Sequence, residues 1–325
     1  MLRMADRIAT TGLLVSPDVF GMTRDDQRAF LALRDEIALA IAASTVVIAD
    51  NVIDYYASNA KTVNTGNLQS DCPCLAPSCD VLFVEHKVNP LWDHPTDDDC
   101  VPLNRLGVLY LWEKAENAVQ LCHRLRFQDG MASKELPESK NAKWFCVVNV
   151  VQEFKTRDAV QEVHLPTVLS MWLDAHGVIT EFNVCGAIPI DGSAEDMKLD
   201  LMGTIYGSLL AVAFMNCKNV ARNDVTATEG PSDKWIRRQK TSRIRYHVLD
   251  INPMKEVLQV EGGIETNGLK KALHICRGHF ATYTPDKPLF GSVVGTFWKP
   301  SHVRGTIESG AVLKDYRIGA LPKTQ

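Results

Sequence analysis

Two segments near the end of the chain gather residue types that transfer protons and bind phosphate. They are residues 274–283 (His-Ile-Cys-Arg-Gly-His-Phe-Ala-Thr-Tyr) and residues 297–305 (Phe-Trp-Lys-Pro-Ser-His-Val-Arg-Gly). Successive residues of a β-strand point to opposite faces of the sheet. If the first segment is a strand, Arg277, His279 and Tyr283 share one of its faces.

The second segment could complete a site for phosphoryl transfer if it pairs with the first. Metal-independent cleavage of RNA needs a group that takes the 2′-hydroxyl proton, a group that protonates the leaving oxygen, and a cation at the phosphorane. We expect His279 and His302 to exchange the protons, because imidazole titrates near neutrality. Arg277 and Arg304 would bind the phosphate, and Tyr283 would orient it. The alternative is that the histidines have a structural role beside a glycine bulge.

The same region also allows a zinc site as the alternative cofactor. Cys217, His274, Cys276 and His279 are the ligand types that zinc prefers. Strand alternation places His274 and His279 on opposite faces, so a turn after Cys276 would be needed. A small buried residue at the end of an apolar helix is the commoner role for a free cysteine such as Cys217. The first expectation is therefore that no cofactor is bound.

A basic run precedes these segments and is expected to bind nucleic acid. Six cations and one tryptophan lie within twelve residues: Lys234, Trp235, Arg237, Arg238, Lys240, Arg243 and Arg245. Cations that neutralise phosphates, together with an aromatic stacking surface, are typical of contact with nucleic acid. RNA is favoured over DNA as the partner, because the predicted chemistry uses a 2′-hydroxyl. Alternatively, the arginines could lie along a sheet face with the tryptophan packed beneath them.

The charge of the chain divides at the same place. The 325 residues carry a net charge of −4, but from Cys217 onward 18 Lys and Arg stand against 10 Asp and Glu, a net of +8. Residues 1–216 therefore carry −12. An asymmetry of this kind indicates an anionic partner for the basic part. We predict two regions: an acidic mixed region 1–216 with a long N-terminal helix, and a basic β-rich nucleic-acid-binding region 217–325.

Composition excludes several other classes of protein. A hydrophobic fraction of 46% with a small net charge is unlike a disordered chain. The longest apolar run, residues 37–49, is shorter than the about 20 residues that span a bilayer. No signal peptide is recognisable at the N-terminus. We therefore expect a cytoplasmic protein with reduced cysteines and without a membrane partner; the sequence leaves its oligomeric state open.

The elements that must position these residues are helices and mostly antiparallel strands. The helices are expected at residues 23–56 and 197–215. The strands are expected at residues 80–86, 106–111, 145–151, 168–174, 178–184, 244–251, 272–283 and 292–298. With no β-α-β alternation and no glycine-rich nucleotide motif, the expected class is α+β, with a twisted antiparallel C-terminal part. The pair Glu85-His86 could be catalytic only if the fold brings it to the C-terminal histidines.

The C-terminal pattern resembles a known group of sequences. H-x-C-R-G-H-F-x-x-Y followed by F-W-x-P-x-H-x-R-G is similar to the C-terminal signature of uncharacterised proteins of phages, prophages and other mobile elements. The segment 214–220 (Phe-Met-Asn-Cys-Lys-Asn-Val) resembles a companion motif of that group. The resemblance covers about residues 210–305 and implies a phage or mobile-element context without a reaction.

Two functions remain after these comparisons of motifs. The R-G-H and H-x-R-G elements are also loosely similar to small ribonuclease toxins that work on a twisted sheet. The leading hypothesis is a protein acting on nucleic acid, with a metal-independent, ribonuclease-like site. The alternative is a non-catalytic nucleic-acid-binding regulator or host-interaction protein with a structural zinc.

Overall fold

The computed structural model of the chain describes residues 3–15, 24–59, 72, 74–88, 103–125, 141–155, 160–186, 194–225, 244, 246–250, 272–276, 279–299, 302–304 and 306–311. The helices are α1 (Met4–Thr11), α2 (Arg24–Ala43), α3 (Asp50–Asn59), the 3-10 helix η3 (Ala115–Asn117), α5 (Ala118–Arg124) and α6 (Ala194–Met215). The strands are β1 (Leu14–Val15), β2 (Thr45–Ile48), β3 (Val81–Lys87), β4 (Leu103–Lys114), β5 (Trp144–Lys155), β6 (Val160–Leu173), β7 (Ile179–Gly186), β8 (Ala221–Val225), β9 (Tyr246–Asp250), β10 (Ala272–Cys276), β11 (His279–Tyr283), β12 (Gly295–Lys299), β13 (His302–Arg304) and β14 (Thr306–Ala311).

Most of the described strands belong to one mixed sheet. Its order is β1-β6-β5-β4-β3-β2-β9-β8, and β7 also pairs with β6. Strands β3 to β7 are consecutive antiparallel neighbours. By contrast, β2 pairs parallel with β3 and β9, and β1 pairs parallel with β6. The expected α+β class is confirmed as helices packed on a mixed sheet.

The single helix expected at residues 23–56 is wrong in its extent. Residues 45–48 (Thr-Val-Val-Ile) form β2 between α2 and α3. All four residues of this strand are β-branched, which favours a strand over a helix. These residues lie within the apolar run 37–49, where the sequence shows neither a clear helical nor a clear strand periodicity. As a result β2, α3 and β3 form one β-α-β unit, which the sequence had not predicted.

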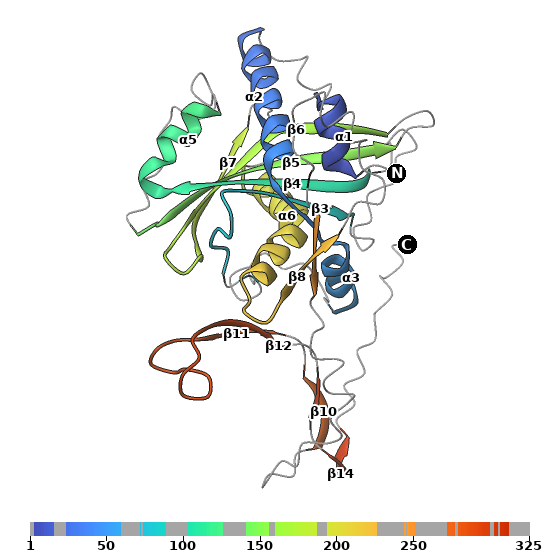
Figure 1. Cartoon of the computed structure of the whole chain (residues 1–325), viewed down its shortest axis with the longest axis vertical. Coiled ribbons are helices and arrows are strands. Elements are labelled where there is room, and N and C mark those ends of the chain that lie inside the picture. The colour runs from blue at the N-terminus through green and yellow to red at the C-terminus, as the bar shows by residue number, and fades with distance from the viewer. Residues whose placement is uncertain are drawn as a thin grey trace, which may run out of the picture.

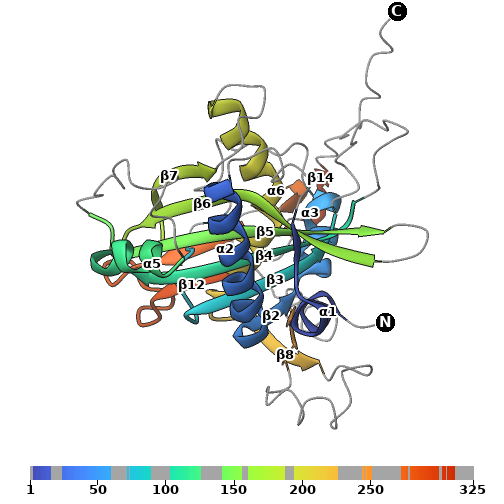
Figure 2. The same ribbon diagram turned by 90° about the horizontal axis from the view of Figure 1, so that it is seen from above.

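The sheet lies between two layers of helices, each with its own apolar core. Figure 1 and Figure 2 show α1, α2 and α5 on one side of the sheet, and α3 and α6 on the other. Strand alternation divides the buried side chains between the two cores. For example, Leu82 and Val84 of β3 face the α6 layer, whereas Phe83 faces the α1–α2 layer.

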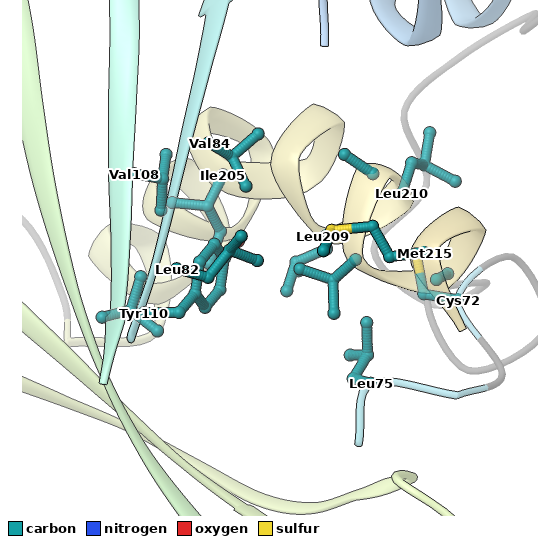
Figure 3. Packing of buried hydrophobic residues seen from close by; sticks show 14 of the residues in the cluster. Cys72, Leu75, Leu82, Val84, Val108, Tyr110, Ile205, Leu209, Leu210 and Met215 are labelled. Atoms are coloured by element: carbon teal, nitrogen blue, oxygen red, sulfur yellow. The ribbon is translucent and has the colours of Figure 1, made fainter. Parts of the chain in front are cut away.

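Helix α6 is the most deeply buried helix of the described part of the chain. Every residue from 205 to 215 is buried. The close view shows α6 between the sheet, at Leu82 and Tyr110, and the segment that carries Cys72 and Leu75 (Figure 3). The hydroxyl groups of Tyr110 and Ser208 lie 2.6 Å apart, so the one buried phenol at this contact has a polar partner.

Two further observations bear on the predicted organisation. Strands β8 and β9, which follow residue 217, pair within the large sheet. The division of the chain into regions 1–216 and 217–325 stays a prediction. Among the described residues, none of the helices combines the length and apolarity that a bilayer span requires.

Replacement of Gly107 by alanine is expected to destabilise the protein. A Cβ atom at Gly107 would lie 2.2 Å from Cζ of Phe83 and 2.7 Å from Sδ of Met4, where α1 packs on β4. Overpacking of this kind costs about 1–3 kcal/mol of unfolding free energy, which urea titration measures.

The matched control for Gly107→Ala is Gly203→Ala in α6. A Cβ at Gly203 meets nothing within 4 Å. Alanine is favoured over glycine in a helix by about 0.5–1 kcal/mol, so this variant is expected to be as stable as the parent or more stable. Equal stability of the Gly107 variant and the parent would show that α1 does not pack as described.

Candidate nucleic-acid interface

The two C-terminal strand pairs follow one register. In β10–β13, Cys276 pairs with His302, and in β11–β12, His279 pairs with Lys299. Both ladders are antiparallel. Counting back from His279 and on from Lys299 by three residues each leads to the pair Cys276 and His302. We refer to strands β11 and β12 with the loop 284–294 as the hairpin.

The inner face of the hairpin packs on the end of α6 through three aromatic rings. The ring centroid of Trp298 lies 4.7 Å from that of Phe214 and 4.8 Å from that of Phe280, and Phe214 and Phe280 are 5.1 Å apart. Trp298 is 4% exposed. Tilted and edge-to-face pairs at these separations stabilise beyond the area that they bury. The rings fix which face of the hairpin can meet a partner.

The connector between α6 and β8, residues 216–220, holds the edge of β12 through hydrogen bonds. The Asn219 side chain donates to the carbonyl oxygen of Trp298 at 2.6 Å and accepts from its amide at 2.8 Å. The Lys218 amide donates to the Thr296 carbonyl at 3.0 Å, and the Lys218 ammonium group donates to the Val294 carbonyl. These bonds satisfy backbone groups that an edge strand would otherwise leave open.

Asn216 and Cys217 of the same connector have structural contacts. The Asn216 amide donates to the carbonyls of Cys74 at 3.1 Å and Ala76 at 2.9 Å, which ties the end of α6 to that segment. The Cys217 thiol donates to the Ala213 carbonyl at 3.4 Å. Burial, and secondarily the nearby Cys74, raises the pKa of Cys217 to about 12. A buried thiol with a carbonyl partner fits the structural role that is common for a free cysteine.

The outer face of the hairpin presents aromatic and cationic groups together. Tyr283 and Phe297 form an edge-to-face pair with ring centroids 6.0 Å apart. The Lys299 ammonium group lies 5.3 Å from the Tyr283 ring centroid, within cation–π range. His279 is exposed on the same strand, opposite Lys299 in the register. Stacking rings beside cations can contact bases and phosphates at once.

The structure places only part of the predicted catalytic group. His279 and Tyr283 share the outer face of β11, as strand alternation predicted. Arg277 lies outside the described residues. His302 and Arg304 belong to β13, where the backbone pairs them with Cys276 and His274.

The proton exchange predicted for the two histidines therefore stays a prediction. Among the described ladders, His279 and His302 are not register partners. The zinc set of Cys217, His274, Cys276 and His279 also stays a prediction. The basic run lies outside the described residues; its members are Lys234, Trp235, Arg237, Arg238, Lys240, Arg243 and Arg245.

Glu85 belongs to a buried ion-pair network beneath α1. Its carboxylate lies 2.9 Å from Nε of Arg105 and accepts a 3.2 Å hydrogen bond from the Met4 amide at the start of α1. Arg105 also pairs with Asp50 at 3.0 Å. Burial raises the pKa of Glu85, while Arg105 opposes that shift. Glu85 thus contributes to the packing of α1 on the sheet, away from the hairpin.

Three further charges continue this network across the sheet. In the register, Arg105 pairs with Glu153 and Glu153 pairs with Glu162. Both glutamates are under 5% exposed and form ion pairs with Arg7 of α1. Buried carboxylates without such partners would cost several kcal/mol, so Arg7 is a condition for packing α1 here.

His86 is buried on the opposite face of β3 from Glu85. Its Nδ1 atom lies 2.8 Å from the Lys87 carbonyl oxygen, so this nitrogen carries the proton of the neutral ring. Burial lowers the pKa of His86 to about 4. Because Glu85 and His86 face different cores, the fold does not assemble them into a catalytic pair with the C-terminal histidines.

Sequence reasoning found His279 and Tyr283 of the hairpin but assigned no role to Phe297, Lys299 or the hydrogen bonds of the connector. Nothing in the composition of residues 214–220 distinguished Phe214 or Asn219; only the companion-motif resemblance had marked this segment. The buried network had no signal either, since its members are far apart in the sequence. Comparison of the chain with protein-family models, curated proteins and solved structures gives no match.

Replacement of Asn219 by alanine is expected to loosen the hairpin from α6. It removes both side-chain bonds to the Trp298 backbone, each worth about 0.5–1.5 kcal/mol. Amide hydrogen exchange at residues 295–299 is expected to accelerate, with exchange in β5 unchanged. Asn183→Ala, which removes a single side-chain bond to Glu181 on β7, is the control. Unchanged protection of β12 in Asn219→Ala would contradict the role of the connector.

The pKa of His86 predicts a loss of stability in acid. The folded state binds this proton more weakly than the unfolded chain, whose pKa is near 6.5. The contribution of His86 to the free energy of unfolding is therefore complete above pH 6.5 and is lost as the pH falls through 4. Between pH 7.5 and pH 5 the parent should lose about 2 kcal/mol from this group.

The measurement is urea unfolding at both pH values, for the parent and for His86→Gln. The glutamine variant lacks the titrating group, so between the two pH values its free energy of unfolding should fall by about 2 kcal/mol less than that of the parent. Glu85 and Glu162 have raised pKa values and act in the opposite direction in both proteins, so they cancel in the comparison. Parallel losses in the two proteins would refute the assignment to His86.

Proposed function

We propose that this chain is a cytoplasmic nucleic-acid-binding protein of phage or mobile-element type, which holds RNA against the outer face of the hairpin. The observation that carries the proposal is the grouping of Tyr283, Phe297, Lys299 and His279 on that face. Base stacking on aromatic rings is tolerant of sequence, and cations follow the phosphate backbone. RNA is chosen over DNA from the sequence pattern.

The attachment of the inner face supports the same proposal. Phe214 and Asn219 hold Trp298 from two directions, so the outer rings need not be ordered when a ligand binds. A surface fixed in advance loses less conformational entropy on binding.

The charge distribution gives the third support. The sequence from residue 217 onward has a net charge of +8, and the basic run 234–245 directly precedes β9 in the chain. Within residues 279–299, Asp286 is the single acidic residue. A cationic surface raises the association rate with an anionic polymer and gives affinity that falls with salt.

The proposal covers the binding of RNA and does not include its cleavage. Cleavage by His279 and His302, with Arg277 and Arg304 on the phosphate, stays a prediction. The alternative with a structural zinc also stays a prediction.

The proposal is tested with a short fluorescein-labelled single-stranded RNA and fluorescence anisotropy. Tyr283→Ala is expected to weaken binding by about 1–3 kcal/mol through lost stacking. Lys299→Gln is expected to reduce the slope of log K against log salt by about 0.7, which is the share of one phosphate contact on a single strand.

The structure offers a matched control for these variants. Lys143 lies 5.7 Å from the ring centroid of Trp144, a second cation–aromatic pair on the large sheet. Lys143→Gln removes the same charge from the same kind of pair and should leave RNA binding unchanged. Equal weakening by Lys143→Gln and Lys299→Gln would assign binding to net charge rather than to the hairpin. Absence of binding by the parent would overturn the proposal.

A further inference from the structure

The tip of the hairpin carries an aromatic ring in a backbone position that disfavours it. Phe290 has a φ of 51° and Gly291 a φ of 77°. The Ser292 amide donates to the Leu289 carbonyl at 3.3 Å, so Phe290 and Gly291 are the two central residues of a turn. Positive φ at both positions is the requirement of type I′ turns, where Asn-Gly is strongly preferred. A bulky residue with positive φ is an outlier.

The ring of Phe290 contributes little to the fold. Its side chain is 90% exposed, the most exposed of the large hydrophobic residues in the described part of the chain. The turn is closed by backbone bonds in both directions between Leu289 and Val293, at 2.8 and 2.9 Å. The turn would therefore form with asparagine or glycine at position 290, and with less strain.

The surroundings of the ring favour a nucleic-acid base over a protein partner. Gly291 and Ser292, which follow it, are exposed and carry little apolar area, and Val293 at the end of the turn is 36% exposed. A stable protein interface buries about 1,000 Å² or more, which one ring cannot provide. One base, in contrast, stacks on one ring. The same hairpin carries Lys287 and Lys299. A phosphate backbone can lie beside these two cations while a base reaches the ring.

We propose that Phe290 stacks on a base of the nucleic acid that the hairpin holds. This inference rests on the proposed function, since the outer face and the tip would contact the same strand. Tyr283, Phe297 and Lys299 would hold the strand along the hairpin. Phe290 would engage a base at the end of that path, as aromatic wedges do in other nucleic-acid complexes.

The experiment compares four variants on the same labelled single-stranded RNA. Phe290→Asn removes the ring and suits the turn, so its urea midpoint should equal or exceed that of the parent, while its affinity falls by about 5- to 150-fold. Phe290→Leu keeps an apolar side chain without a ring and should also weaken binding. Phe290→Trp keeps a ring and should bind like the parent. Val293→Ala, at the other end of the turn, should have no effect.

An RNA with abasic nucleotides gives the second arm. Where a nucleotide has no base, the ring has nothing to stack on, so the parent should bind one of a series of singly abasic RNAs more weakly. Phe290→Asn should not distinguish that RNA from the intact one.

The outcomes separate this inference from the function beneath it. If Tyr283→Ala and Lys299→Gln weaken binding but Phe290→Asn and Phe290→Leu do not, the hairpin binds RNA and the role of Phe290 is wrong. If Phe290→Leu binds like the parent and Phe290→Asn does not, the site is apolar rather than stacking, and the inference fails. If the parent binds no RNA, both fail.

Discussion

From residue 205 onward helix α6 is buried on all sides, and the need to keep this part from water organises the protein. One side of α6 packs on the sheet, where Tyr110 meets Ser208. The other side is covered by the segment around Leu75 and, at its C-terminal end, by Phe280 and Trp298 of the hairpin. A helix of this kind cannot be stable at a surface. The hairpin is therefore held in place by the core and presents one face to solvent.

The opposite layer is organised by charge. Helix α1 packs on the sheet through Arg7 and the Met4 amide, which meet buried glutamates on three strands. Breaking such a pair costs more than forming it stabilises, because one charge remains buried alone. This network therefore specifies where α1 lies, and its charged residues pair with one another inside the fold. On the outer face of the hairpin, Tyr283, Phe297 and Lys299 lie together, and we assign function to this face because of that grouping.

The parts of the fold with a simple period could be predicted from the sequence. Apolar runs of strand length identified β3, β4 and β5, and strand alternation placed His279 and Tyr283 on one face. The period failed at β2, because Thr45–Ile48 lies in a longer apolar run that also suits a helix. Contacts between distant residues were beyond prediction: neither the bonds of Asn219 to Trp298 nor the pairing of Glu85 with Arg105 has a local signal. Phe290 was overlooked because its importance depends on a φ angle and on exposure.

The central claim is that nucleic acid binds the outer face and tip of the hairpin. Ultraviolet cross-linking of the protein to a single-stranded RNA, followed by identification of the modified peptides, tests it directly. The account predicts cross-links on Tyr283, Phe290 or Phe297, which are lost in competition with unlabelled RNA. Cross-links confined to the sheet strands β4 to β7, with none between residues 279 and 299, would contradict it.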